Sequence, residues 1–265
     1  MVWVLIMKNL SQHKIFDSHF HIIDNRFPLI RNQGYLPDNF STTTYLNRTK
    51  NYPVIGGTIV SGSFQGFDQD YLLAALADLG PNFVGVTQLP ATVSDAELIR
   101  LSRAGVRGVR FNLKRGGSEG IEKLDRFSRH IYDLVGWHTE LYVDSKDLPD
   151  LYNILIQLPR VSIDHLGLSQ AGLPNLLSLV EKGVFVKATG FGRVDFSVKS
   201  VLQEIAAINP DALMFGTDLP STRAPRPYSD DDYFTVIDAL GEKLAQKVFH
   251  ENGVKFYRPK GLSNK

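Results

Sequence analysis

The sequence of 265 residues contains no cysteine, which excludes disulfides, zinc sites built on thiolates and a cysteine nucleophile. It also has almost no excess charge, because 29 lysines and arginines face 28 aspartates and glutamates. Without a strong overall field, nucleic acid and anionic membranes are not expected as partners.

Long apolar runs are missing as well. No stretch approaches the roughly 18 consecutive apolar residues that a membrane-spanning helix needs. The first ten residues, MVWVLIMKNL, contain only a short apolar run, without a leading basic segment or a small-residue cleavage site. This segment is a poor match to a signal peptide, and we expect a cytoplasmic protein.

What the sequence does contain is a regular alternation of short β-branched, apolar runs with helix-like segments. Eight strands are expected, over residues 14–23, 54–60, 83–89, 106–113, 139–144, 161–167, 184–190 and 213–220. Helices are expected over residues 68–79, 95–104, 121–135, 148–158, 173–183, 198–208, 230–240 and 243–250. Eight such units predict an α/β fold, a (β/α)8 TIM barrel, as a single domain over residues 1–265 with an N-terminal extension over residues 1–13.

One connection is longer than the others. About 30 residues, 24–53, separate the first expected strand from the second, and their many turn residues argue against a regular helix. A long loop after a barrel strand belongs at the carboxyl-terminal face, where barrel enzymes place their active sites.

Polar residues gather at the ends of the expected strands. His19 and His21 lie one residue apart in strand one, so both imidazoles point to the same side. The other positions are Arg110 and Asn112 in strand four with Lys114 and Arg115 just after it, Glu140, Tyr142 and Asp144 in strand five, Asp164 and His165 in strand six, Lys187 and Arg193 in and after strand seven, and Asp218 in strand eight. A barrel brings these ends to one mouth.

The residue types at this mouth allow two kinds of chemistry. Neutral imidazoles can donate hydrogen bonds to a carbonyl oxygen, while an ionised Asp218 takes a proton from an attacking water. The same residues, His19, His21, His165 and Asp218, could instead bind a divalent metal such as zinc or manganese. Both possibilities imply attack of water on a carbonyl group, and the arginines favour substrates with carboxylates.

The motifs DSHFHIID, VRGVRFNL, IDHLG, VKATG and FGTDLP resemble the amidohydrolase superfamily, in the same order and over roughly residues 14–259. Within it they are most similar to the branch that hydrolyses 2-pyrone-4,6-dicarboxylate and sugar lactones. The resemblance implies a hydrolase that opens a small anionic lactone, with His19, His21 and His165 polarising the carbonyl and Asp218 activating water. It further implies that the substrate is bound by a second set of residues, namely Arg110, Arg115, Tyr142, Tyr35, Ser63 and Arg193.

Two departures from the family pattern bear on substrate and metal. Leu168 stands where the branch has an arginine, so one anion contact is missing. Asn112 and Tyr142 stand where metal-dependent branches place a further ligand, so we expect no cofactor, although a zinc or manganese ion stays possible. The alternatives are a neutral sugar-lactone hydrolase, a mononuclear metal-dependent hydrolase or decarboxylase, and a carboxylate-binding protein without catalysis.

Overall fold

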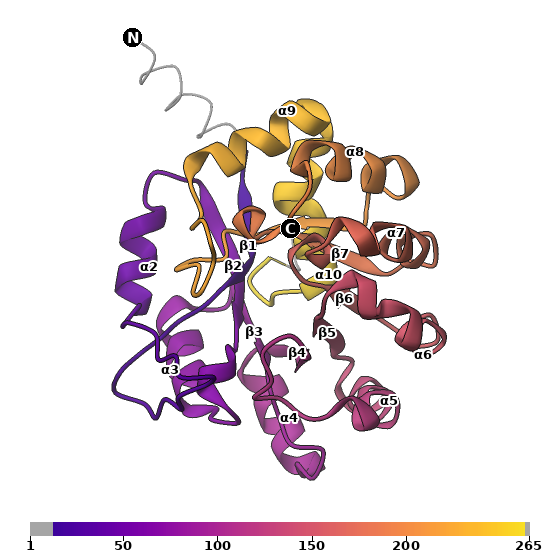
Figure 1. The fold of residues 1–265 in the computed structure, drawn as a ribbon. Coiled ribbons are helices and arrows are strands. Elements are labelled where there is room, and N and C mark those ends of the chain that lie inside the picture. Colours follow the sequence, from indigo (N-terminus) through magenta and orange to yellow (C-terminus); the bar gives the residue numbers. More distant parts are fainter. Residues whose placement is uncertain (1–12, 263–265) are drawn as a thin grey trace.

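The computed structural model describes residues 13–262 and contains one sheet of eight parallel strands, each paired with the next in chain order. Figure 1 shows the strands at the centre of the molecule with the helices arranged around them. The strands are β1 Ile15–Phe20, β2 Val54–Val60, β3 Phe83–Thr87, β4 Val106–Asn112, β5 His138–Tyr142, β6 Val161–Ile163, β7 Phe185–Ala188 and β8 Leu213–Phe215. The predicted (β/α)8 barrel is confirmed. The expected N-terminal extension, residues 1–13, lies outside the described residues except for His13.

The barrel closes where the segment after β8 meets β1. The Asp218 N–H donates to the His19 carbonyl and the His21 N–H donates to the Leu219 carbonyl, each at 2.7 Å. These two backbone hydrogen bonds bring three predicted site residues together at the carboxyl-terminal end of the barrel.

The helices cover the outside of the sheet. They are α2 Thr42–Thr49, α3 Asp70–Leu79, α4 Asp95–Ala104, α5 Leu124–Val135, α6 Tyr152–Leu155, α7 Leu173–Glu181, α8 Val198–Ile208, α9 Asp230–Gln246 and α10 Asn252–Tyr257. Within residues 13–262, no helix combines the length and apolar character that crossing a bilayer requires. At the other end of the barrel, α10 places Phe256 and Tyr257 against Phe16 and Met214, which fills that end with apolar side chains.

Helix α2 contradicts the expectation that residues 24–53 hold no regular helix. Its three leading threonines have a low helix propensity because their side chains branch at Cβ. The helix is stabilised by contacts that the local sequence does not reveal. Ser41 Oγ accepts the N–H of Thr44 at its start, and the Tyr45 ring stacks on Phe20 with ring centroids 3.8 Å apart.

Three further elements are shorter or less regular than expected. The helix expected over residues 148–158 is a 3-10 helix, Ser145–Leu151, followed by the short α6. Pro149 lies inside the 3-10 segment and cannot donate a backbone hydrogen bond there. Strands β6 and β8 end at residues 163 and 215, because the chain turns sharply before His165 and Asp218.

Candidate active site

The site is anchored by Asp17, a buried carboxylate on β1 that sequence reasoning did not single out. Its Oδ1 accepts the backbone N–H of Thr217 at 2.9 Å, and its Oδ2 accepts the hydroxyls of Thr217 at 2.7 Å and Tyr45 at 3.0 Å. Burial raises the pKa of the Asp17 carboxyl to about 6, although these hydrogen bonds act in the opposite direction. Asp17 thereby ties β1 and α2 to the loop that carries Asp218.

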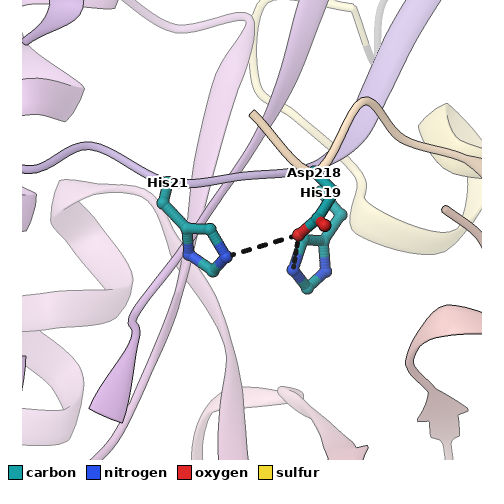
Figure 2. Close-up of side chains that lie close together, drawn as sticks. All are labelled: His19, His21 and Asp218. Atoms are coloured by element: carbon teal, nitrogen blue, oxygen red, sulfur yellow. Dashed lines mark ion pairs between the residues drawn. The ribbon is translucent and has the colours of Figure 1, made fainter. Parts of the chain in front are cut away.

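His19, His21 and Asp218 meet at this closing seam, as Figure 2 shows. Asp218 Oδ1 lies 3.9 Å from His19 Nε2 and 3.7 Å from His21 Nε2. The two imidazole rings are perpendicular, with centroids 5.1 Å apart. Within the described part of the chain, Asp218 Oδ1 and His19 Nε2 are buried without a hydrogen-bond partner. Unpaired buried polar atoms are costly, so these two are candidates for contact with a substrate.

The other carboxylate oxygen of Asp218 is occupied. Arg193 Nε donates to Oδ2 at 2.7 Å, and Arg193 Nη2 donates to the carbonyl of Thr222 at 2.9 Å. Burial alone would raise the pKa of the Asp218 carboxyl, but the positive charge of Arg193 lowers that pKa far below its ordinary value. Asp218 is therefore ionised at neutral pH.

His165 reaches the same site from the turn after β6. Its ring centroid lies 4.8 Å from that of His19 and 4.9 Å from that of Tyr142. Burial lowers the pKa of His165 to about 3, so the imidazole is neutral at physiological pH. Gly190 makes room for it, since a Cβ there would lie 2.4 Å from His165 Nδ1. The sequence-predicted set His19, His21, His165 and Asp218 is thus brought together.

The backbone at this site is strained. Asp218 has φ of +58° and His165 has φ of +52°, both in the left-handed region that non-glycine residues rarely adopt. Such conformations persist where the surrounding structure enforces them, and they cluster at functional sites.

A buried charge network lies beneath the histidines, inside the barrel. Arg110 donates through Nε and Nη2 to Asp164 Oδ2, at 3.2 and 2.7 Å, and through Nη1 to the Ser61 carbonyl at 2.8 Å. Lys187 Nζ lies 2.5 Å from Glu140 Oε2 and 3.2 Å from His19 Nδ1. Burial lowers the pKa of His19 well below that of a free imidazole, and the charge of Lys187 lowers it further. His19 is therefore neutral.

His21, the second histidine of the seam, is fixed by a backbone contact. Its Nδ1 lies 2.7 Å from the carbonyl oxygen of Val60. A carbonyl oxygen only accepts hydrogen bonds, so Nδ1 carries a hydrogen, and in a neutral His21 the lone pair is at Nε2, toward Asp218.

Among residues 13–262, two groups of three side chains have the spacing of metal ligands: His19, His21 and Asp218, and His19, Asp164 and His165. Asp218 and neutral His21 offer lone pairs to a cation. His19 Nδ1 lies 3.2 Å from Lys187 Nζ and 3.4 Å from Asp164 Oδ1, and the tautomer of His19 decides whether its Nε2 offers a lone pair.

A small cavity opens above these residues, with about 30 Å³ of space accessible to water. Most of the predicted substrate contacts line it, together with residues not predicted from the sequence. The lining comprises His21, Gly62, Ser63, Phe64, Arg110, Asn112, Arg115, Tyr142, His165, Arg193, Thr222 and Arg223. At least four other hollows in the described part of the chain are larger, but none of these four is lined by His19, His21, His165 or Asp218.

Arg223 is the main cavity residue that sequence reasoning missed. Its guanidinium carbon lies 4.5 Å from the centre of the Tyr35 ring, and its Nη1 donates to Asn32 Oδ1 at 3.1 Å. Tyr35, predicted to touch the substrate, thus lies behind Arg223 and outside the cavity lining. Arg223 lies five residues after Asp218, in the loop that follows β8. That position was the sequence feature from which its place in the cavity could have been predicted.

A family model described as amidohydrolase matches residues 16–258. The chain belongs to the amidohydrolase family. It is 26% identical to 2-pyrone-4,6-dicarboxylate hydrolase of Comamonas testosteroni, over 92% of this chain and 90% of that protein. It is 25% identical to 4-sulfomuconolactone hydrolase of Rhizobium radiobacter, over 91% and 89%.

The fold of this family member is shared with solved structures. The crystal structure of ATU3138 from Agrobacterium tumefaciens superposes with a TM-score of 0.82, at 20% sequence identity, over 95% of this chain and 98% of that chain. Family membership makes the protein an enzyme of the hydrolase class, in line with the sequence-based prediction.

Proposed function

We propose that the protein hydrolyses a small lactone that carries a carboxylate or another anionic group. The observation that carries this proposal is the cavity, in which four arginines, Arg110, Arg115, Arg193 and Arg223, surround the histidines beside Asp218. Two relatives that match the chain nearly end to end are named for anionic lactones, one a dicarboxylate and one a sulfonate.

The anion contacts are best assigned to Arg115 and Arg223. Within the described residues, the guanidinium of Arg115 has no carboxylate partner. Burial lowers the pKa of Arg223, and the like charge of Arg115 lowers it further, because the two positive charges repel each other. An anionic group between them would relieve this repulsion and accept hydrogen bonds from both. Arg110 lines the same cavity, but its three nitrogens already donate to Asp164 and Ser61. We therefore expect Arg110 to contribute less to binding the anionic group than Arg115 and Arg223.

In the proposed reaction, the oxygen of a water molecule forms a bond to the lactone carbonyl carbon while Asp218 Oδ1 accepts one of its protons. The carbonyl electron pair moves to the carbonyl oxygen, and the Nε2–H of His19 stabilises the resulting oxyanion, with His165 beside it. Collapse of this intermediate breaks the ring C–O bond. Asp218 then returns the proton to the leaving oxygen, which gives a carboxylic acid and a hydroxyl group.

His21 takes a different part from the one predicted. Because its Nδ1–H is held by Val60, a neutral His21 accepts at Nε2 and cannot donate there to a carbonyl. His21 Nε2 and Asp218 Oδ1 are 3.7 Å apart, which suits two acceptors that share the hydrogens of one water molecule. We therefore assign His21 to the orientation of the attacking water.

A substrate panel tests the proposal. The kcat/KM should be measured for 2-pyrone-4,6-dicarboxylate, 4-sulfomuconolactone and a neutral aldonolactone. Since a hydrogen bond to a charged group is worth roughly 1.5–3 kcal/mol, we expect the anionic lactones to be preferred by about 10- to 100-fold for each anionic contact. Equal turnover of the neutral lactone would contradict the assignment of the arginines. Tight binding without turnover of any lactone would point to a binding protein.

A further inference from the structure

Lys187, on β7, is a charged side chain that the proposed reaction does not use directly. It is fully buried in the barrel and lies among Glu140, Asp164 and His19. Its Nζ also lies 5.6 Å from the centre of the Tyr257 ring, so this aromatic ring covers one side of the ammonium group. Burying an ammonium is expensive unless it is paired, and here two carboxylates supply the opposite charge.

The contact with His19 fixes where that imidazole carries its hydrogen. Lys187 Nζ lies 3.2 Å from His19 Nδ1, and an ammonium has three donors and no acceptor. Asp164 Oδ1 lies 3.4 Å from the same nitrogen and could compete for it. The Lys187 contact is the shorter of the two, at 3.2 Å against 3.4 Å, so we take Lys187 as the partner that sets the tautomer and Asp164 as its competitor.

We propose that Lys187 is a positioning residue that holds neutral His19 as the Nε2–H tautomer. The hydrogen then points toward the side of His19 that faces Asp218, where Nε2 has no hydrogen-bond partner within residues 13–262. Two consequences follow from this one contact. His19 presents a donor to a substrate oxygen, which rests on the proposed lactone hydrolysis, and its Nε2 is unable to ligate a metal, which does not.

The hydrogen bonding of His19 is the reverse of that usually found at histidines that bind a metal. Histidines that ligate a metal through one ring nitrogen usually donate the other N–H to a carboxylate or carbonyl. Here the candidate ligand set His19, His21 and Asp218 is intact, but the second nitrogen of His19 faces a donor. Without Lys187, Asp164 Oδ1 would become the natural acceptor for an Nδ1–H, and Nε2 would be free to bind a cation.

The first test uses the wild-type protein and needs no substrate. Nitrogen-15 NMR of protein labelled in histidine distinguishes protonated from unprotonated ring nitrogens, and a His19→Asn variant assigns the signals of His19. We expect a protonated Nε2 and an unprotonated Nδ1 at neutral pH. A protonated Nδ1 would overturn the proposal whatever the enzyme's substrate proves to be.

The second test compares Lys187→Met, Lys187→Arg and, as a control, Lys199→Met, which removes an exposed lysine paired with Asp238. In Lys187→Met we expect the hydrogen of His19 to move to Nδ1. Calorimetric titration with Zn²⁺ should show a gain in affinity of about 10- to 100-fold, the range that such outer partners govern. Lys187→Arg and Lys199→Met should resemble the wild type. A folded Lys187→Met protein that keeps the Nε2–H tautomer and gains no affinity for zinc would refute the role of Lys187.

These outcomes separate the inference from the proposed function. If the tautomer is as expected but no anionic lactone is turned over, the lactone assignment fails and the positioning role stands. If anionic lactones are turned over while His19 carries its hydrogen on Nδ1, the positioning role fails and the function stands.

Discussion

Replacing Asp218 with asparagine removes the proposed base with little change of shape. Asparagine tolerates the left-handed backbone conformation of this position, and its side-chain oxygen can still accept the N–H of Arg193. A general base contributes about 10²- to 10⁴-fold to a rate, which corresponds to roughly 3–5 kcal/mol of transition-state stabilisation. We therefore expect kcat to fall by that factor, while KM changes little because the arginines of the cavity remain.

The assay is steady-state hydrolysis of an anionic lactone, with thermal unfolding followed by circular dichroism on the same samples. Asp218→Asn leaves Arg193 without its counter-charge, so the unfolding temperature should drop and kcat should be measured well below it. Asp238→Asn, an exposed carboxylate paired with Lys199, is the matched control and should leave kcat unchanged. Near-normal turnover by Asp218→Asn would remove this residue from the role of base and refute the mechanism.

Three further predictions concern binding, stability and pH. Arg223→Met should raise KM for anionic lactones by about 10- to 100-fold and leave KM for a neutral lactone unchanged. Arg129→Met, at an exposed arginine, is the control. An equal rise of KM for anionic and neutral lactones would show a structural effect instead. Tyr45→Phe removes the hydroxyl that donates to Asp17 and should lower the free energy of unfolding by about 1–3 kcal/mol, measured by urea titration. An unchanged urea midpoint would mean that α2 does not depend on this hydrogen bond. The folded-state pKa of His165 is lowered from 6.5 to about 3, so on acidification the unfolded chain binds a proton on His165 before the folded protein does. The stability contributed by His165 is therefore present above pH 6.5 and is lost as the pH falls toward 3. His165→Gln should flatten this dependence, and an unaltered pH profile of unfolding would contradict it.

The barrel itself could be predicted from the sequence because buried parallel strands appear as short apolar runs between amphipathic helices. The errors fall where tertiary contacts override local preference. Helix α2 depends on the stacking of Tyr45 on Phe20 and on the bond to Asp17, which is 28 positions away in the chain. The chain after β6 and β8 leaves the strand conformation early so that His165 and Asp218 can adopt positive φ angles.

The site could be predicted only in part. The family motifs located the histidines and Asp218, and the structure places them together. The motifs could not show that Arg193 holds Asp218, or that Arg110 is engaged by Asp164 rather than free for a substrate. They also gave no sign that Lys187 contacts His19, because these residues are 168 positions apart and meet only when the barrel closes.

The most direct test of the account is hydrolysis of 2-pyrone-4,6-dicarboxylate by protein that has been treated with a chelator and shown by elemental analysis to be free of metal. The account predicts full turnover, with no increase when Zn²⁺ or Mn²⁺ is added. Loss of turnover on chelation, with recovery on addition of either ion, would contradict the mechanism in which His19 donates to the carbonyl and Asp218 activates water.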